Sequence, residues 1–379
     1  MKKKTIHFVY AFGPNKSCPN AIGNELTIRL SENYLVVQHQ WDSQDIITPQ
    51  RGDILLGHPH HNPKTVFRIS VRDRRWARKI MICPFSHGDY SFSAFQDSVI
   101  RDCDLYMAIT GSYWFDSIDK SLYVDWMPKM RHLDLAVNKA DFPWIKLQFN
   151  PPGKRKLIYI GHLGKYKNTR YLSEIAIANP EIDFFWAGPG DSSGIPGVFA
   201  YGYVDFQSES GRALIKNHDF LVTVGNSDSN PTTILEAMSW GIIPICTPQS
   251  GYLNNPGMIN IPLNNVDEAS KIIKWANEIH EGELIKMQLI NSRMIDEHFN
   301  WDRFADDVMR ELQSTEAPMI KSHPIRRLFL RYYASVSLDD DSTFLVRAIR
   351  FLRSYRYLYM IIRALHRKIR SLVDSKVRH

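Results

Sequence analysis

The sequence predicts an α/β protein with two parallel-sheet domains and a helical extension at its C-terminus. Apolar runs alternate with amphipathic stretches along most of the chain, which is typical of parallel strands joined by crossover helices. The chain has 379 residues, more than one compact domain usually holds. A stretch rich in proline and basic residues, 141–155, lies near the middle, and a strongly basic segment follows residue 316. We therefore expect domains at 1–140 and 156–316, a linker at 141–155 and a tail at 317–379.

Composition and cysteine usage point to a protein of the cytoplasm. Apolar residues make up 44% of the chain and charged residues 23%, as in soluble globular proteins. The four cysteines form no CxxC pair, which favours buried, reduced thiols. The first apolar run ends at Gly13 and Pro14, so it is too short for a signal peptide and fits a first strand. No run reaches the roughly 18 apolar residues of a membrane span.

In the first half, strands and helices alternate from the first residues onward. The expected strands are 5–10, 34–38, 53–57, 79–83 and 105–109, and the expected helices are 21–31, 63–77, 93–101 and 112–118. Ligands of such sheets bind at the carboxyl ends of the strands, so the loops at that edge are the candidates for function.

Two groups in the first half resemble metal ligands. His58, His60 and His61 follow the third strand, and adjacent histidines can bind a metal, but no fitting cysteine or acid accompanies them. Asp102 and Asp104 imitate the DxD element of metal-dependent, GT-A type transferases. They precede a strand rather than follow one, so we interpret them as a helix-end and a strand-entry residue and predict no metal site.

The stretch 228–245 organises the second half. A helix is expected to begin near Pro231, because proline fits the first turn, and to end at Gly241 before a buried strand at 242–246. Thr232 and Thr233 leave free backbone N–H groups at that helix start, where an anion is favoured. An acid, Glu236, follows one turn into the helix. These features suit a ligand that carries both hydroxyls and phosphate.

This stretch resembles the glycosyltransferases of family 4, which have the GT-B fold of two Rossmann-like domains facing a cleft. The family has two acids separated by seven residues, and the second acid begins a short motif. The residues that match this motif are Glu236, Ala237, Met238, Gly241 and Pro244. Asp228 stands where the first acid is usually Glu, and Asn230 stands where an aromatic is common.

The resemblance extends to the loop after the strand at 156–160. The family pattern there is Gly-Arg-Leu, three residues, then Lys-Gly, and its Arg and Lys face the donor diphosphate. Gly161, Leu163 and Lys167 match, while His162 replaces the arginine and Asn168 the glycine. A cation at this place would stabilise the charge that develops on the leaving group.

The rest of the second half follows the same order of elements. Gly188 lies in a glycine-containing turn after the strand 181–187, where backbone can approach a ligand closely. The further strands are expected at 201–204 and 220–224, and the further helices at 264–281, 283–294 and 300–312. Specific motifs thus cover about 156–315, whereas over 1–140 the resemblance rests on element order and His87.

His87 follows the fourth strand of the first half. In the family, a histidine at the end of a strand in this half faces the donor sugar, and an imidazole there could hydrogen-bond a sugar hydroxyl or the leaving phosphate. Asp89 is a lesser candidate nearby.

The tail is strongly basic. Residues 321–379 hold fourteen Lys and Arg and four Asp, a net charge of +10 in a chain of net charge +7, so the first 320 residues carry −3. Its second part places an aliphatic and tyrosine-rich stripe at heptad spacing, with most arginines off that stripe. Such a helix suits an anionic membrane surface, and equally a helix that packs on its own body or forms a homo-oligomer. It resembles no nucleic-acid motif.

The resemblance implies a retaining glycosyltransferase that needs no metal and no cofactor besides its nucleotide-diphosphate sugar. Glu236 would bind the ribose hydroxyls of the donor. The diphosphate would be held by Lys167, His162, Thr232, Thr233, Gly161 and Gly188. Asp228 and His87 would act at the transferred sugar. The acceptor would be a glycan or a lipid-linked sugar in cell-surface polysaccharide synthesis, at the inner face of the membrane. The alternatives are a GT-A type enzyme using Asp102 and Asp104, and a non-catalytic nucleotide- or sugar-binding protein.

Overall fold

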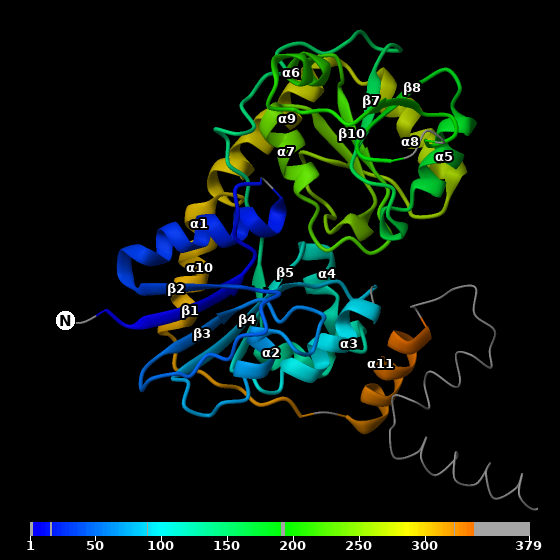
Figure 1. Ribbon diagram of the computed structural model, residues 1–379. Coiled ribbons are helices and arrows are strands. Elements are labelled where there is room, and N and C mark those ends of the chain that lie inside the picture. The colour runs from blue at the N-terminus through cyan, green and yellow to red at the C-terminus, as the bar shows by residue number, and fades with distance from the viewer. Residues whose placement is uncertain (1–2, 16, 89, 191–193, 322, 337–379) are drawn as a thin grey trace, which may run out of the picture.

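The computed structural model describes residues 3–15, 17–88, 90–190, 194–321 and 323–336. Its elements form two six-stranded parallel sheets, one in each half of the chain, with helices packed around each (Figure 1). The predicted class, two α/β domains with parallel sheets, is therefore confirmed. We call the domain of the first sheet the first domain and the domain of the second sheet the second domain.

The first sheet has the strand order β2-β1-β3-β4-β5-β6. Its strands are β1 (Thr5–Tyr10), β2 (Leu35–Gln40), β3 (Ile54–Gly57), β4 (Arg78–Pro84), β5 (Leu105–Ile109) and β6 (Met130–Leu133). Its helices are α1 (Cys18–Asn33), α2 (Val66–Ser70), α3 (Tyr90–Val99), α4 (Ser112–Asp116) and the 3-10 turns η1 (Ile118–Lys120) and η2 (Val124–Lys129). In β1, Ile6 and Phe8 belong to the apolar cluster under α1, while Val9 joins the cluster that also holds residues of α2. Because successive side chains of a strand point to opposite faces, β1 contributes to the apolar clusters on both faces of the first sheet.

The second sheet has the order β12-β11-β10-β7-β8-β9. Its strands are β7 (Lys156–Ile160), β8 (Asp183–Ala187), β9 (Phe199–Gly202), β10 (Phe220–Thr223), β11 (Ile243–Cys246) and β12 (Ile259–Asn260). Its helices are α5 (Thr169–Ala178), α6 (Glu209–Lys216), α7 (Thr232–Trp240), α8 (Val266–Glu278), α9 (Glu281–Glu297) and the 3-10 turns η3 (Lys165–Lys167) and η4 (Pro248–Ser250). Strands β10 and β11 are buried throughout, as expected for parallel strands covered on both faces.

The observed elements differ from the predicted ones in several places. The helix predicted at 63–77 shrinks to α2, because a turn at Asp73 and Arg75 follows it and Trp76 folds inward, where its Nε1 donates to the Ser70 carbonyl at 2.8 Å. The edge strands β6 and β12 were not predicted. Strand β6 is short and interrupted by polar residues, and β12 has two residues, so neither carries an apolar run.

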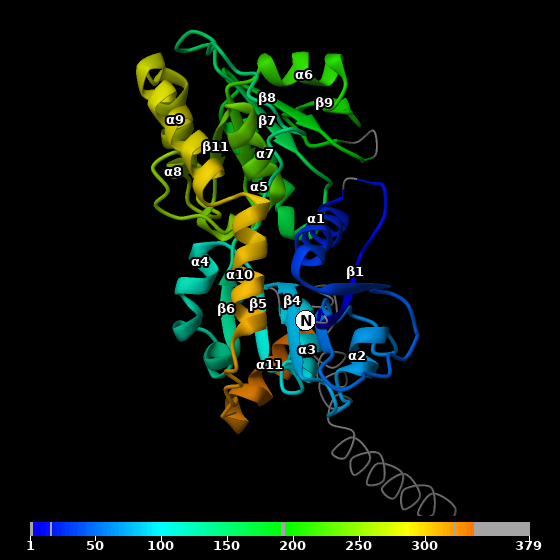
Figure 2. The ribbon, with the colours of Figure 1, turned by 90° about the vertical axis from the view of Figure 1, so that its left-hand side faces the viewer.

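The chain crosses between the domains twice. It passes from the first domain to the second after β6, and it returns at α10 (Trp301–Gln313), which packs against α1 (Figure 2). The two crossings touch, because the Val137 amide donates to the Phe299 carbonyl at 3.0 Å. Lys139 and Asp296 form an ion pair of 2.6 Å beside this bond. The junction between the domains is therefore a pair of bonded segments rather than a single strand of linker.

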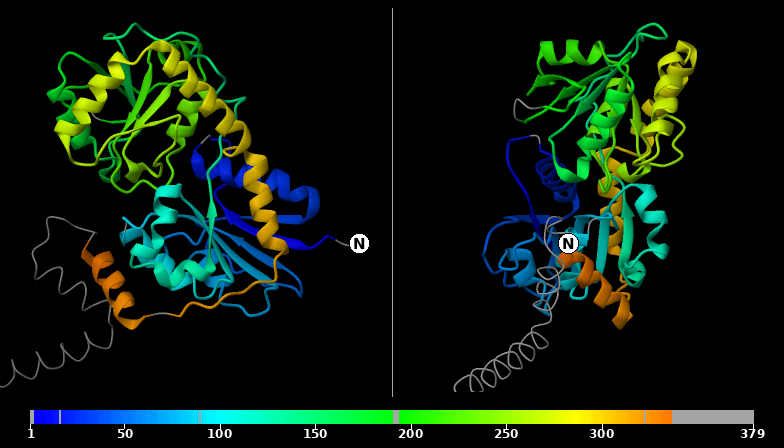
Figure 3. Two further views of the ribbon diagram at one scale, coloured as in Figure 1. Left: turned by 180° about the vertical axis from the view of Figure 1, so that it is seen from behind. Right: turned by 90° about the vertical axis from the view of Figure 1, so that its right-hand side faces the viewer.

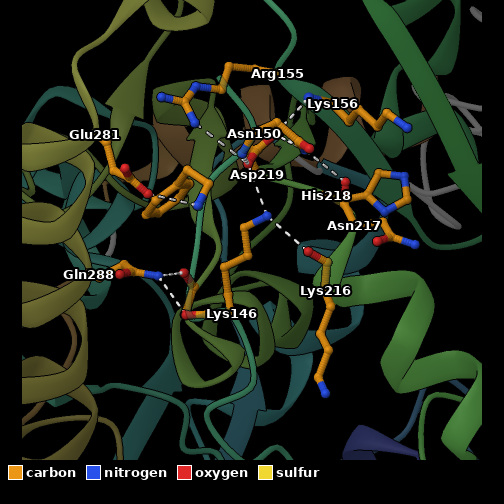
Figure 4. Close-up of polar contacts among 12 residues, drawn as sticks. Lys146, Asn150, Arg155, Lys156, Lys216, Asn217, His218, Asp219, Glu281 and Gln288 are labelled. Carbon is orange, nitrogen blue, oxygen red and sulfur yellow. Dashed lines mark hydrogen bonds and ion pairs between the residues drawn. The ribbon is translucent and has the colours of Figure 1, made fainter. Parts of the chain in front are cut away.

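Among the contacts that fasten the linker to the second domain, several meet at one buried acid, Asp219 (Figure 4). Its carboxylate is fully buried, pairs with Lys146 at 3.0 Å and accepts hydrogen bonds from the backbone of Asn150 and Lys156. Arg155 approaches the same carboxylate at 3.9 Å. Because a buried charge needs partners, this arrangement ties the linker to the start of β10.

The tail begins on the first domain. Helix α11 (Pro324–Val336) packs against α3, far from the second domain (Figure 3). Arg326 pairs with Asp125 at 2.6 Å, Arg327 approaches Asp97 at 3.3 Å, and Leu330 is buried. This part of the tail thus packs on the body, whereas the heptad stripe lies at 337–379, outside the described residues. No helix in the described part of the chain is both long and apolar enough to cross a bilayer.

Candidate active site

The candidate site lies where the strand order of the second sheet reverses. Strands β7 and β10 are neighbours, while β8 follows on one side and β11 on the other. Loops leave the carboxyl ends of β7 and β10 in opposite directions, so a crevice opens between them, and ligands of open parallel sheets bind at such places. The loop after β7 carries Gly161, His162 and Lys167, and the loop after β10 carries Asp228 and leads into α7.

Lys167 and Asp228 meet in this crevice as an ion pair. The Nζ of Lys167 lies 2.5 Å from Oδ2 of Asp228, and both side chains are nearly buried. The backbone supports the pair, because the Asp228 amide donates to the Gln249 carbonyl at 3.1 Å and the Asn226 amide donates to the Tyr166 carbonyl at 3.0 Å. The two loops are therefore bonded to each other through side chains and main chain.

Helix α7 starts beside this pair with no side-chain cap. Pro231 occupies the N-cap position, so the backbone N–H groups of the first turn, including those of Thr232 and Thr233, lack a capping side chain. The N-terminus of α7 therefore offers donors and a partial positive charge to an anion. Gly241 ends the helix in the left-handed conformation (φ 89°), as the sequence predicted.

Glu236 lies one turn further along α7. Burial raises the pKa of its carboxyl to about 7, against a hydrogen bond from the Thr232 side chain and the charge of Lys167, which both lower that pKa. Near neutral pH the group therefore changes charge readily, and donors from a ligand would favour its ionised form.

Two adjoining cavities open between the domains at these residues. One, of about 290 Å³, is lined by Thr232, Glu236 and the loop at 13–15 before α1. The other, of about 380 Å³, is lined by Lys167, Asp228, Thr232 and Thr233. The cavities share Thr232, and both receive side chains from both domains. Five of the residues predicted for donor binding and catalysis thus line these two cavities.

His162 does not line either cavity. Its ring bridges its own loop, because Nδ1 accepts from the Gly164 amide at 3.0 Å and Nε2 lies 2.8 Å from the Tyr166 hydroxyl. Gly161 and Gly188 lie at the ends of β7 and β8, packed backbone against backbone. A Cβ on Gly188 would lie 2.1 Å from the Gly161 carbonyl oxygen. Only glycine therefore fits at position 188. Donor binding by His162, Gly161 and Gly188 stays a prediction.

His87 also lies outside both cavities. Its Nε2 is 2.8 Å from the Ser117 hydroxyl, and its ring packs edge-to-face on Trp114 with 4.7 Å between ring centroids. Burial lowers its pKa, so the ring is neutral at pH 7. The contact of His87 with a donor sugar stays a prediction, and Asp89 lies outside the described residues.

The groups that imitate metal ligands have other partners. His58 is buried with Nε2 3.3 Å from the Cys83 sulfur, and the rings of His60 and His61 lie against each other. Asp104 accepts a hydrogen bond from the Lys79 amide at 2.7 Å, in keeping with a strand-entry residue. Within the described residues, no cluster of three or more His, Cys, Asp or Glu side chains could hold a metal ion.

The candidate residues predicted from the sequence did not include those that α1 and the loop before it contribute to the cavities. Cys18 lines both, and Asn24 and Glu25 line the smaller one from α1. The position of these residues in the chain could have indicated them. They follow β1, which lies between β2 and β3 where the strand order of the first sheet reverses, and ligands bind at such places. The segment at 135–138, which lines the smaller cavity near the crossing, has no such signal.

No protein-family model matches the sequence, and no curated protein matches it. Solved structures do match the fold. A glycosyltransferase from Rickettsia africae has a TM-score of 0.56 at 12% identity, with 83% of this chain and 100% of that chain covered. Sucrose-phosphate synthase from Thermosynechococcus elongatus has a TM-score of 0.61 at 11% identity, covering 82% of this chain and 99% of that chain. The chain has the GT-B fold.

A third GT-B structure carries ligands. Anabaena HepE in complex with UDP and glucose has a TM-score of 0.55 at 10% identity, with coverage of 82% of this chain and 100% of that chain. These likenesses confirm the predicted fold and disfavour the GT-A alternative built on Asp102 and Asp104. At identities of 10–12% these likenesses show the fold alone. The chemistry of this GT-B chain has to be argued from its own residues.

Proposed function

We propose that the protein is a glycosyltransferase that moves a sugar from a nucleotide-diphosphate sugar to an acceptor hydroxyl. The observation that carries this proposal is the grouping of Lys167, Asp228, Glu236 and the uncapped start of α7 around two adjoining cavities between two GT-B domains. A cation and free amides suit a diphosphate, and a carboxylate suits the paired hydroxyls of a ribose. The likeness of the site motif to family 4 of the glycosyltransferases supports the same assignment.

The diphosphate would lie over the N-terminus of α7, with the amides of Thr232 and Thr233 and the ammonium of Lys167 around it. When the bond between the anomeric carbon and the phosphate oxygen breaks, negative charge grows on that oxygen. Donors that are already in place stabilise this charge without reorganising, which is how such sites lower a barrier. These groups could replace a divalent cation in this role, so we propose a metal-independent reaction.

Glu236 would accept hydrogen bonds from the two ribose hydroxyls, and Asp228 would accept from hydroxyls of the transferred sugar. The acceptor oxygen would form the new bond to the anomeric carbon and give up its proton to the departing phosphate. The resemblance to family 4 supports retention of anomeric configuration. His162, Gly161, Gly188 and His87 would complete the donor contacts if their loops rearrange when the donor binds.

The acceptor is proposed from the tail. Residues 321–379 carry a net charge of +10, and α11 places their start on the first domain, the side that faces an acceptor in this proposal. An anionic membrane surface would attract such a segment. We therefore propose a glycan or lipid-linked acceptor of cell-surface polysaccharide synthesis, at the cytoplasmic face of the membrane. A homo-oligomer through the tail is the alternative for the same segment.

The test begins with binding. UDP-glucose, GDP-mannose and ADP-glucose are titrated into the full chain by calorimetry, and release of nucleotide from the best binder is then followed with water or glycan as acceptor. Glu236→Gln should abolish release, while Glu283→Gln on the exposed side of α9 should leave it unchanged. Normal release by Glu236→Gln would remove the assignment, and binding without any release would favour the non-catalytic alternative. Activity that a chelator abolishes and Mn²⁺ restores would overturn the metal-independent mechanism.

A further inference from the structure

Three consecutive carbonyls of the Asp228 loop are bonded by the other domain. The Ser227 carbonyl accepts from the Ser86 hydroxyl at 3.0 Å, and the Asp228 carbonyl accepts from the indole Nε1 of Trp114 at 2.8 Å. The Ser229 carbonyl accepts from the Gly111 amide at 2.8 Å. Ser86 lies in the loop after β4, Gly111 lies in the loop after β5, and Trp114 lies in α4, the short helix that follows Gly111 in the first domain. The backbone that carries the acid of the second domain is thus held from across the cleft.

The other groups of Asp228 are held within the second domain. Its amide donates to the Gln249 carbonyl, and its carboxylate pairs with Lys167. The loop at 227–229 is therefore shared between the two domains. Its position, and with it the direction of the carboxylate, depends on both sets of bonds at once.

The packing around these bonds leaves little slack. A Cβ on Gly111 would lie 2.0 Å from the Gly251 carbonyl oxygen, and that oxygen accepts from the Tyr113 amide at 3.2 Å. Gln249 donates to the Tyr113 hydroxyl at 3.1 Å. On its far side, Trp114 packs on His87. A shift of the domains relative to each other would therefore break several of these bonds together.

We propose that Trp114 is a positioning residue of the transfer site, acting through the main chain of Asp228. This inference rests on the proposed function. The indole N–H fixes the Asp228 carbonyl, so the carboxylate reaches the transferred sugar only while the first domain is docked on loops 227–229 and 249–251. Reacting groups lose on the order of 100-fold in rate when displaced by about 1 Å, so even a small change in this loop affects turnover.

The donor itself should be bound by the second domain. Lys167, Thr232, Thr233 and Glu236 all belong to it, and among the described residues the indole N–H of Trp114 bonds the Asp228 carbonyl rather than any of these four side chains. Removing the indole N–H should therefore lower kcat and leave the donor KM nearly unchanged. If Trp114 were only a structural residue, its replacement would instead reduce the fraction of folded protein and, with it, the number of donor molecules bound per chain.

The first experiment tests the contact without using activity. A Cβ on Gly88 would lie 3.0 Å from Cβ of Ser227 and 3.0 Å from the Trp114 ring. Disulfides join Cβ atoms about 3.5–4.5 Å apart, so the bond forms once the Gly88 loop moves about 0.5 Å away from both. In the full chain, Gly88→Cys combined with Ser227→Cys should cross-link the domains on mild oxidation, as seen by thiol titration and peptide mass. The two single variants are the controls. A double variant that keeps both thiols under oxidation overturns the inference.

The second experiment measures the positioning. Trp114→Phe keeps an aromatic ring against His87 and removes the N–H, and Trp275→Phe on the exposed surface of α8 is the matched control. With the best-binding nucleotide-sugar, Trp114→Phe should lower kcat about tenfold, with donor KM within threefold and calorimetric stoichiometry unchanged. A kcat within twofold of the parent, or a donor KM that changes as much as kcat, overturns the inference.

The two proposals fail in different ways. If Glu236→Gln turns over normally while the Gly88 and Ser227 cysteines still cross-link, the assignment of the donor site fails and the docking of the domains stands. If Glu236→Gln is inactive and Trp114→Phe is normal, the function stands and the positioning role is wrong.

Discussion

Donor affinity should depend steeply on pH through Glu236. Burial raises the pKa of this carboxyl to about 7 in the free protein. The proposed contact with ribose hydroxyls needs the ionised form, which accepts hydrogen bonds at both oxygens. A ligand that donates to the carboxylate stabilises its charge, so the pKa should fall on binding. The protein therefore has to lose a proton to bind the donor below about pH 7.

The size of the effect follows from the two pKa values. If binding returns the pKa to its ordinary value of 4.5, the change is about 2.5 units, or roughly 3 kcal/mol. Proton linkage then makes the affinity about tenfold lower at pH 6 than at pH 8, and roughly 50- to 100-fold lower at pH 5.

Calorimetry with the best-binding nucleotide-sugar between pH 5 and 8 measures this dependence. The diphosphate diester of the donor keeps its charge over this range, and Glu236→Gln is the matched control for every other group that titrates. The Glu236→Gln variant should bind the donor more weakly than the parent at pH 8, and its affinity should lack the part of the pH dependence that comes from Glu236. Parallel pH dependences for the parent and Glu236→Gln would refute both the raised pKa and the ribose contact.

The same carboxyl affects stability with the opposite sign from an acid whose pKa is lowered by folding. Because its pKa is higher in the folded than in the unfolded state, its contribution is fully present below about pH 4.5 and is lost as the pH rises through about 7. The loss is at most about 3 kcal/mol. Denaturant unfolding of the parent and of Glu236→Gln at pH 5 and 8 should show the parent losing more stability than the variant.

Three further predictions concern other parts of the chain. Asp219→Asn leaves Lys146 buried without its charge partner, so it should cost about 3–5 kcal/mol in denaturant unfolding of the second domain, whereas Asp296→Asn in an exposed ion pair should cost less than about 1 kcal/mol. A similar cost for both variants would contradict a buried network. Lys167→Met should lower kcat on the order of 100-fold or more, because it removes a donor aimed at the leaving group; a loss below fivefold would exclude that role. Deleting 337–379, which spares α11, should release the protein from anionic vesicles but leave its unfolding midpoint unchanged, and equal vesicle binding with and without the segment would contradict a membrane role.

Strand–helix alternation was enough to predict the fold, because buried parallel strands carry apolar runs whose position depends little on tertiary context. Strands at 5–10, 105–109 and 156–160 match the sequence prediction to the residue. The failures come from short-range chemistry and from edges. The helix predicted at 63–77 ends early, at Ser70, because a turn forms at Asp73. Strand β12 has two residues and is too short to show an apolar pattern.

The grouping of Lys167, Asp228 and Glu236 in one crevice could be predicted from the sequence, and the contribution of the first domain could not. Two neighbouring strands, β7 and β10, lead into the segments that carry these residues: Lys167 follows β7, and Asp228 and Glu236 follow β10. Because the carboxyl ends of neighbouring parallel strands lie side by side, the three residues are expected to lie close together. Trp114 meets Asp228 only because two domains dock in one arrangement. That arrangement is set by α10, the crossing at 137–145 and loops of both domains, and no local pattern encodes it.

This asymmetry has a chemical origin. A nucleotide diphosphate needs amides, a cation and a carboxylate at fixed separations, and one strand–loop–helix unit can supply them, so the requirement leaves a readable motif between 156 and 315. In the proposed function, the acceptor would be recognised by side chains from several loops of the first domain, which lie far apart in the sequence. In this chain those loops also hold the acid of the second domain through three main-chain bonds. The first domain should therefore influence the rate of transfer as well as the choice of acceptor, and variants of Trp114 that alter kcat without altering donor binding are the direct measure of that influence.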